Sequence, residues 1–226
     1  MSQNLLIFDM DGVLVDVTES YRETIQRTVE HFTGTRITRE SIQDYKNRGG
    51  FNDDWKLSHQ IIADLGRSAE YKDVVDYFQN IFHGNGSDGL ILRERWLAAD
   101  GFFERLARSY KLSVFTGRLR WEAHVTLSRF ARDLFAPVVG SDDVARTKPA
   151  PDGLVKIRIT VPHKKVWYVG DTVDDARSAS AAGVPFIGIA SLASPRRPEL
   201  ISLLQAEGAV AVLTDINELE AAIANG

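Results

Sequence analysis

One short stretch, residues 5–12, constrains the fold of this chain more than any other. Four apolar residues, 5–8, are followed at once by Asp9, Asp11 and Gly12. An uninterrupted apolar run of this length is typical of a strand buried on both faces of a parallel sheet. Open α/β sheets bind ligands beyond the carboxyl ends of their strands. We therefore expect the two acids at a binding site, with a turn at Gly12.

Two carboxylates this close together need a counter-charge. At about 4 Å and an effective dielectric constant of about 20, their repulsion costs on the order of 4 kcal/mol. A proton, a basic side chain or a hard dication with oxygen ligands, above all Mg²⁺, would offset it. The alternative is an ordinary surface turn, because Asp and Gly are common turn residues.

The second part of the chain alternates between strand and helix patterns. Strands are predicted at 112–115, 137–140, 166–169, 185–189 and 211–213, and helices at about 101–109, 120–132, 152–159, 172–182, 199–206 and 216–224. This alternation predicts an α/β fold with a mainly parallel sheet and helices on both faces.

Between the first strand and this alternating part, the spacing of apolar residues is helical throughout. Helices are predicted at about 18–32, 38–48, 53–65 and 68–82, and Ser20 with Glu23 fits a capping box at the start of the first, although Thr18 could equally be the N-cap. A glycine-rich loop follows at 83–89. We expect an all-helical domain at 16–90 inserted into a core domain formed by 1–15 and 91–226.

The composition excludes several classes of function. There is no cysteine among the 226 residues, so disulfides, thiolate zinc sites and a cysteine nucleophile are ruled out. A net charge of −4 gives no sign of nucleic-acid binding. No apolar run approaches the roughly 18 residues of a membrane span, and the first residues do not resemble a signal peptide. We expect a cytoplasmic protein with no nucleic-acid or membrane partner.

Two further sites lie beside predicted strand ends. Thr116 and Gly117 follow the strand at 112–115, where a hydroxyl and free backbone N–H groups can bind a phosphate oxygen. Lys148 precedes Pro149, which favours an extended backbone at the lysine. An ordinary strand-to-turn transition and a solvated lysine are the alternatives.

The strand at 166–169 ends as the first one does, with acids. Gly170-Asp171 follows it, and Asp174 and Asp175 come shortly after. Thr172 and Asp175 also fit a capping box, which is compatible with a place at the same site. We expect the arginines at 118, 120 and 146 to be surface charges.

These four sites together resemble a known family. Asp9-x-Asp11-Gly12, Thr116, Lys148-Pro149 and Gly170-Asp171-x-x-x-Asp175 are similar, in order, to the four motifs of the haloacid dehalogenase-like (HAD) hydrolase superfamily. The resemblance covers the whole chain. It implies a Rossmann-like three-layer core, and it makes the helical insert similar to the cap of members that carry a cap between the first two motifs.

The resemblance also implies roles for these residues. Asp9 would be the nucleophile that forms an aspartyl-phosphate, and Asp11 the general acid and base. Mg²⁺ would be held by Asp9, Asp11 (through its backbone carbonyl) and Asp171, with support from Asp175. The residues that would bind the phosphoryl group are Thr116, Gly117 and Lys148.

A phosphatase acting on a small phosphorylated metabolite is the function that the resemblance favours. The alternatives are a phosphomutase of the β-phosphoglucomutase kind and a non-catalytic phosphate-binding module. Substrate choice is expected in the segment 47–55, with Arg48 as a substrate-binding candidate. Phosphoglycolate, a sugar phosphate and an amino-alcohol phosphate all remain open, as does a monomeric or homodimeric state.

Overall fold

The computed structural model describes residues 3–131 and 133–224. Its centre is a six-stranded sheet in the order β5-β4-β1-β6-β7-β8, in which every neighbouring pair is parallel. The strands are β1 (Asn4–Phe8), β4 (Tyr110–Phe115), β5 (Val138–Val139), β6 (Val166–Gly170), β7 (Phe186–Ile189) and β8 (Ala211–Leu213). The predicted α/β fold and its parallel sheet are confirmed.

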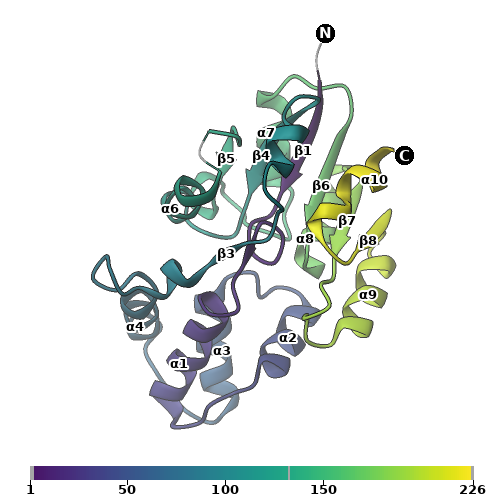
Figure 1. Cartoon of the computed structure of the whole chain (residues 1–226). Coiled ribbons are helices and arrows are strands. Elements are labelled where there is room, and N and C mark those ends of the chain that lie inside the picture. Colours follow the sequence, from purple (N-terminus) through teal and green to yellow (C-terminus); the bar gives the residue numbers. More distant parts are fainter. Residues whose placement is uncertain (1–2, 132, 225–226) are drawn as a thin grey trace.

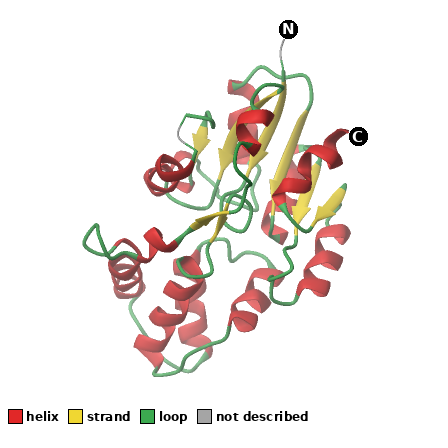
Figure 2. Cartoon of the chain, in the orientation of Figure 1, coloured by secondary structure: helices red, strands yellow, loops and turns green. Residues whose placement is uncertain are grey.

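The sheet is the middle one of three layers, as Figures 1 and 2 show. The covering helices are α5 (Phe102–Leu106), α6 (Arg120–Phe130), α7 (Asp152–Thr160), α8 (Val173–Ala182), α9 (Arg197–Ala206) and α10 (Leu219–Ala224). Within β1, Leu6 and Phe8 belong to one hydrophobic cluster, while Leu5 and Ile7 belong to another. Because successive side chains of a strand point to opposite faces, β1 supports both layers of the core.

Four helices separate β1 from the rest of the sheet. They are α1 (Tyr21–Thr33), α2 (Arg39–Arg48), α3 (Asp54–Asp64) and α4 (Tyr71–His83), followed by the short 3₁₀ helix η1 (Leu90–Arg93). Two short strands, β2 (Val15–Asp16) and β3 (Arg95–Trp96), pair antiparallel and bring the two ends of this segment together. We call the segment between these strands, residues 17–94, the helical insert.

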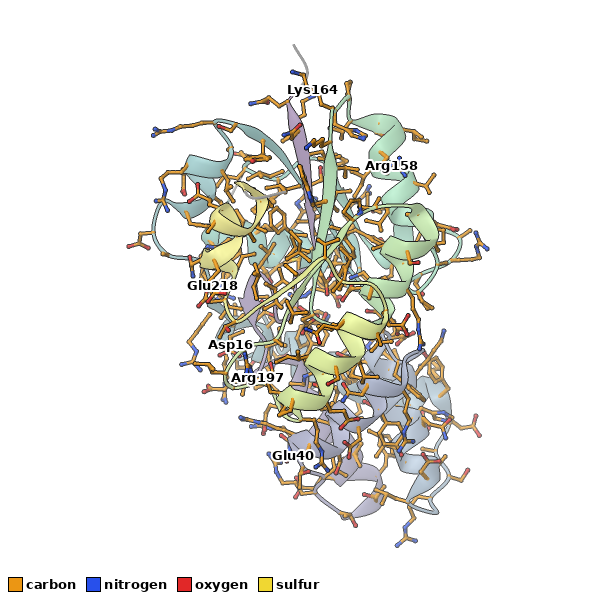
Figure 3. All side chains as sticks on the ribbon, turned by 90° about the vertical axis from the view of Figure 1, so that its right-hand side faces the viewer. Asp16, Glu40, Arg158, Lys164, Arg197 and Glu218 are labelled. Carbon is orange, nitrogen blue, oxygen red and sulfur yellow. The ribbon has the colours of Figure 1, made fainter. Side chains whose placement is uncertain are left out.

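The insert lies beyond the carboxyl ends of the parallel strands. In Figure 3, Lys164, just before β6, lies at one end of the molecule, and Glu40 on α2 lies towards the other. The insert therefore faces the edge of the sheet at which an α/β fold binds its ligands.

The helix ends differ from the predicted ones in detail. Ser20 precedes α1, but its side chain makes no capping hydrogen bond and its Oγ donates to Glu94 instead. The predicted capping box at Ser20 is therefore wrong. Helix α5 is shorter than predicted, and Arg132, expected to end the helix at 120–132, lies outside the described residues. The 3₁₀ turn η2 (Ser141–Asp143) was not predicted, and the helix predicted at 216–224 begins with a 3₁₀ turn, η3 (Ile216–Glu218), before α10.

Candidate functional site

The predicted site residues follow three neighbouring strands of the sheet. Asp9 follows β1, Thr116 follows β4 and Asp171 follows β6. Asp9 and Thr116 are buried, and Asp171 is half-buried. The structure thus gathers groups that are far apart in the sequence at one edge of the sheet.

Gly12 lets two of these loops approach each other. It has a φ of +72°, and a Cβ atom placed on it would lie 2.1 Å from Oδ2 of Asp171. Only glycine combines this backbone conformation with so short a distance. The turn after Asp11 is therefore packed directly against the carboxylate of Asp171.

Lys148 lies between two carboxylates. Its Nζ is 2.7 Å from Oδ1 of Asp9 and 2.7 Å from Oδ1 of Asp175, and its side chain has no exposed surface. Among the described residues, neither Nζ nor Oδ1 of Asp9 has a partner with hydrogen-bond angles. These contacts are therefore ion pairs by distance alone, and the buried oxygen of Asp9 keeps its hydrogen-bonding capacity for another group.

Burial and mutual repulsion perturb the acids of this cluster. Burial raises the pKa of Asp9 to about 7, although the Lys148 ammonium opposes the shift. The pKa of Asp171 is raised well above its usual range by desolvation and by the carboxylates of Asp175 and Asp9. Burial also acts to raise the pKa of Asp175, but Lys148 outweighs it and the pKa is lowered. The raised pKa values of Asp9 and Asp171 show that the nearby positive charge does not compensate for the burial of their carboxylates and their repulsion by neighbouring acids.

The same three acids could hold a metal ion. Asp9, Asp171 and Asp175 each offer an oxygen, and these oxygens lie within 4.8 Å of one another. Lys148 is the one cation within ion-pair distance of them in the described part of the chain. Three carboxylates against one ammonium leave two negative charges, which a divalent cation would balance. An all-oxygen set of this kind suits Mg²⁺.

Asp175 is fixed more firmly than Asp9. Its carboxylate accepts hydrogen bonds from the hydroxyls of Tyr168 and Thr172, both 2.6 Å away, and from the backbone N–H of Thr172. Thr172 Oγ1 accepts from the N–H of Asp175 in return, so the predicted capping box at the start of α8 is confirmed. Asp175 thus caps the helix and faces Lys148 at the same time.

Arg118 is buried, and the prediction that it is a surface charge is wrong. Its side chain is 1% exposed. Nε and Nη2 donate to Oδ1 of Asp11 at 2.8 and 2.5 Å, and Nη2 also donates to Oε1 of Glu94 at 2.6 Å. Arg120 and Arg146 are exposed as expected.

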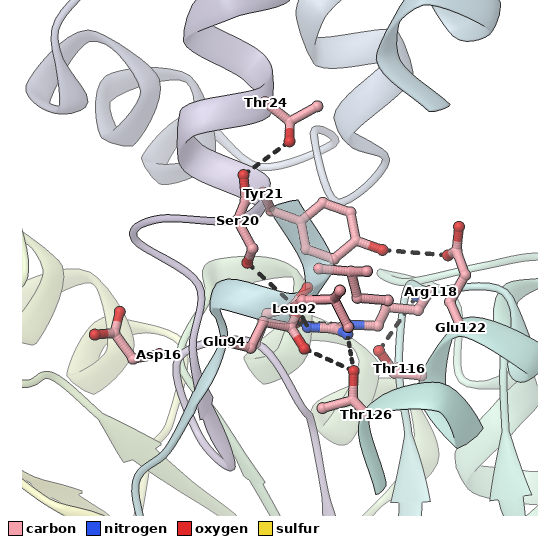
Figure 4. A network of polar contacts seen from close by, with 12 residues as sticks. Asp16, Ser20, Tyr21, Thr24, Leu92, Glu94, Thr116, Arg118, Glu122 and Thr126 are labelled. Atoms are coloured by element: carbon pink, nitrogen blue, oxygen red, sulfur yellow. Dashed lines mark hydrogen bonds and ion pairs between the residues drawn. The ribbon is translucent and has the colours of Figure 1, made fainter. Parts of the chain in front are cut away.

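The surroundings of Arg118 join the core to both ends of the helical insert (Figure 4). Glu94, the last residue of the insert, also accepts hydrogen bonds from Ser20 and from Thr126 on α6. The ring of Tyr21, the first residue of α1, lies 4.8 Å from the guanidinium carbon. We call Arg118, Asp11 and Glu94 with these neighbours the Arg118 cluster. It holds the carboxylate of Asp11 in place.

Gly117 and Arg48, both expected to bind substrate, lie in different surroundings. Gly117 lies under the insert, since a Cβ on it would be 2.4 Å from Nδ2 of Asn52. Arg48 does not line the cavity that Gly117 helps to form between the core and the insert. It is exposed, with its guanidinium 4.7 Å above the ring of Tyr45. Asp174 does not contact the acids at the strand ends through a hydrogen bond, and its carboxylate accepts from the backbone N–H of Gly50 at 2.8 Å.

Comparisons with known proteins agree with this geometry. The model of the haloacid dehalogenase-like hydrolase family matches residues 6–189. The chain is 32% identical over 196 residues to an imidazoleglycerol-phosphate dehydratase from Phytophthora nicotianae, covering 81% of this chain but only 42% of that protein. It is 26% identical to the pyrophosphatase PpaX of Bacillus pumilus, covering 83% of each.

The fold is also found among solved structures. A conserved haloacid dehalogenase-like protein from Agrobacterium tumefaciens superposes with a TM-score of 0.75 at 21% identity, covering 99% of this chain and 98% of that one. In the described part of this chain, none of the helices combines the length and the apolar character needed to cross a bilayer.

Proposed function

This chain belongs to the haloacid dehalogenase-like hydrolase family, and from that premise we propose that it is a phosphate-ester hydrolase. In this proposal it is a Mg²⁺-dependent phosphatase of a small phosphorylated metabolite and works through an aspartyl-phosphate. The observation that carries the proposal is the position of Lys148, buried between the carboxylates of Asp9 and Asp175 at 2.7 Å from each.

Asp9 is the proposed nucleophile. A carboxylate oxygen of Asp9 attacks phosphorus, the ester P–O bond breaks, and the phosphoryl group is transferred to Asp9. The ammonium of Lys148 and the hydroxyl of Thr116 bind the phosphoryl oxygens, and Lys148 reduces the repulsion between Asp9 and the incoming dianion. Oδ1 of Asp9 supports this role, because it is buried without a hydrogen-bond partner in the described structure.

Asp11 is the proposed proton carrier. It donates a proton to the departing alcohol oxygen and then removes one from the water that attacks the aspartyl-phosphate, so that phosphate is released and Asp9 is regenerated. Both steps require the carboxyl group of Asp11 at a fixed place. The two hydrogen bonds from Arg118 to Oδ1 provide that restraint and leave Oδ2 free for the proton.

Asp9, Asp171 and the backbone carbonyl of Asp11 would hold Mg²⁺, with Asp175 in support. The fit rests on the three carboxylate oxygens within 4.8 Å of one another and on the two negative charges that Lys148 leaves unbalanced. When bound, the ion would supply charge stabilisation for the phosphoryl oxygens.

Phosphate release from a panel of small phosphomonoesters, with Mg²⁺ and with a chelator, tests the proposal. We expect turnover with Mg²⁺ alone, and none for Asp9→Asn, because an amide is not a nucleophile of this kind. Asp100→Asn is the matched control, since Asp100 is exposed and is not one of the residues that form the acidic cluster or line the cavity. If no phosphate is hydrolysed in either condition, the proposed phosphatase function is wrong. If Asp9→Asn remains active, Asp9 is not the nucleophile.

The same assay separates a phosphatase from a phosphomutase. A sugar 1-phosphate is incubated with a bisphosphate primer, and both products are measured. Free phosphate is the expected product, whereas an isomeric sugar phosphate without phosphate release would identify a mutase.

A further inference from the structure

A cavity lies between the core and the helical insert, next to the proposed phosphoryl site. Gly117, which directly follows Thr116, and Thr147, which directly precedes Lys148, are part of its wall. Tyr21, Trp55 and other residues of the insert form the opposite side. The group that leaves phosphorus would extend into this space.

The volume of the cavity limits what it can hold. It measures about 60 Å³, which is room for a group the size of a few water molecules. A cavity of this size suits a short alcohol part.

The charged residues in the cavity wall are mainly acidic. Three acidic residues line it: Asp53, Asp54 and Glu122. The one cationic side chain that lines it in the described structure is Arg118, whose donors already bind Asp11, Glu94 and Thr126. An anionic group entering the cavity would find no free cation to pair with.

The three carboxylates differ in how far they are neutralised. Asp54 is paired with the buried ammonium of Lys46 at 2.5 Å. Asp53 caps α3 through two backbone N–H groups, and its nearest ammonium, that of the exposed Lys56, is 3.8 Å away. The cavity therefore keeps a negative charge at Asp53.

Glu122 adds to this negative charge. It accepts hydrogen bonds from the backbone N–H of Leu119 and the hydroxyl of Tyr21, neither of which carries a charge. Its other oxygen lies 2.9 Å from Nε2 of His83, which is cationic only when protonated. The carboxylate is 4% exposed, so water screens it little.

Two aromatic residues complete the wall. Tyr21 and Trp55 line the same cavity as Asp53 and Glu122. The faces of aromatic rings attract cations, but the ring of Tyr21 already lies against the guanidinium of Arg118 and the ring of Phe82. Trp55 is therefore the aromatic side chain of this wall that would attract a further cation. Acidic and aromatic walls in one small space together favour a positively charged guest and disfavour a negatively charged one.

We infer that the alcohol released by this enzyme carries a positive charge, so that the substrate is the phosphomonoester of a small amino alcohol. The inference rests on the proposed phosphatase function and names its substrate class. It separates this chain from an enzyme for phosphoglycolate, whose leaving alcohol bears a carboxylate, and from a pyrophosphatase, whose leaving group is itself an anion.

Three phosphomonoesters of nearly equal size test the inference. O-phosphoethanolamine, ethyl phosphate and 2-phosphoglycolate each contain a two-carbon alcohol. They differ in the charge of that alcohol part, which is positive, neutral and negative respectively. We expect kcat/KM to fall in that order, with about tenfold or more between the first and the last, since a charge pair in a partly screened site is worth at least that. Phosphoglycolate as the best substrate would overturn the inference.

An aryl phosphate in the same assay keeps the two proposals apart. If p-nitrophenyl phosphate is hydrolysed but the three esters show no dependence on charge, the substrate class is wrong and the phosphatase function stands. If no phosphate is hydrolysed, the phosphatase function itself fails.

Two substitutions locate the effect in the cavity. Glu122→Gln and Asp53→Asn each remove one charge and keep an oxygen that can accept the same backbone hydrogen bonds. In each variant we expect the ratio of kcat/KM for O-phosphoethanolamine to that for 2-phosphoglycolate to fall about threefold or more. The ratio is measured within one preparation, so a partly misfolded variant does not distort it. Asp100→Asn should leave the ratio at its wild-type value, and an unchanged ratio in both cavity variants would contradict the assignment.

Discussion

Two buried cations lie close to the proposed phosphoryl site, and each is placed between two carboxylates. Lys148 lies between Asp9 and Asp175, and Arg118 lies between Asp11 and Glu94. The lysine contacts lack hydrogen-bond angles, whereas the arginine donates directed hydrogen bonds to both of its acids and to Thr126. A side chain whose hydrogen-bond donors are still available, such as Lys148, is suited to binding a substrate. A side chain whose donors are already used, such as Arg118, is suited to holding a neighbouring residue in position.

The two clusters also differ in the parts of the chain that they join. Lys148, Asp9 and Asp175 all belong to loops or helix ends of the core. The Arg118 cluster includes Ser20, Tyr21 and Glu94, at the two ends of the helical insert. The first cluster can therefore remain intact while the insert moves, and the second cannot.

Replacing the lysine should have the largest effect. Lys148→Met removes the cation that the phosphoryl oxygens require, and we expect kcat to fall by about 10³-fold, as for the loss of a main electrostatic contact. It also leaves buried carboxylates unpaired, so the melting temperature should fall. Steady-state kinetics and thermal melts provide the measurement, with Lys164→Met, at an exposed lysine, as the control. A loss below tenfold would place Lys148 outside the reaction.

Replacing the arginine should give an effect that depends on the leaving group. If Arg118 positions Asp11, Arg118→Lys should lower kcat by about 10²-fold for an alkyl phosphate, whose alkoxide needs a proton as it leaves. The loss should be much smaller for p-nitrophenyl phosphate, whose phenolate leaves unprotonated. Arg120→Lys, at an exposed arginine, should affect neither substrate. Equal losses on both substrates would mean that Arg118 serves the fold alone.

Metal and pH together test Asp9 and Asp171, the two acids of the lysine cluster whose pKa values are raised by burial. In the metal-free protein the pKa of Asp9 is raised by burial from 3.8 to about 7, so its contribution to stability is fully present below about pH 4 and is lost as the pH rises through 7. Mg²⁺ at 100 times its Kd should raise the melting temperature by about 5–10 °C at pH 8 and by less at pH 5. The shift should shrink in Asp171→Asn. An equal shift at both pH values would argue against binding through these acids.

The contact between Asp174 and the insert should give the smallest effect. Asp174→Ala removes the acceptor of the Gly50 N–H. One hydrogen bond is worth about 0.5–1.5 kcal/mol, so we expect KM to rise about three- to tenfold with little change in kcat. Ser202→Ala, on the exposed side of α9, is the control. A fall in kcat without a change in KM would assign Asp174 to the reaction and not to docking of the insert.

The sequence predicted the lysine cluster far better than the arginine cluster. Asp9 and Asp171 directly follow strands, and parallel strands bring their carboxyl ends to one edge whatever the loops do. Lys148 lies in the loop between β5 and α7, and its Lys-Pro pattern was the signal that singled it out. Those residues could therefore be placed from local patterns. Their roles in the reaction remain predictions, and so do the bounds of the helical domain.

The partners of Arg118 could not be read from local patterns. Glu94 lies 24 residues before Arg118, and it becomes a neighbour only because β2 and β3 pair to close the insert. Each of these strands has two residues, too few to show a periodic signal. Ser20 was predicted as a helix cap because the local sequence fits one. Its actual partner is Glu94, 74 residues away, which no local pattern could indicate. The position of Arg118 directly after Thr116-Gly117 was the one signal that could have pointed to it.

The position of β1 in the sheet has a consequence for how the chain is made. β1 pairs with β4 on one side and β6 on the other, at residues such as Lys111 and Val166 that are translated long after Leu5. The contacts of α1 with α3 and α4 lie much closer together along the chain. On the ribosome, the helices of the insert can therefore assemble early, while the strand that carries Asp9 waits for both of its neighbours. Asp9, which directly follows β1, can therefore reach its place only after β4 and β6 have been synthesised.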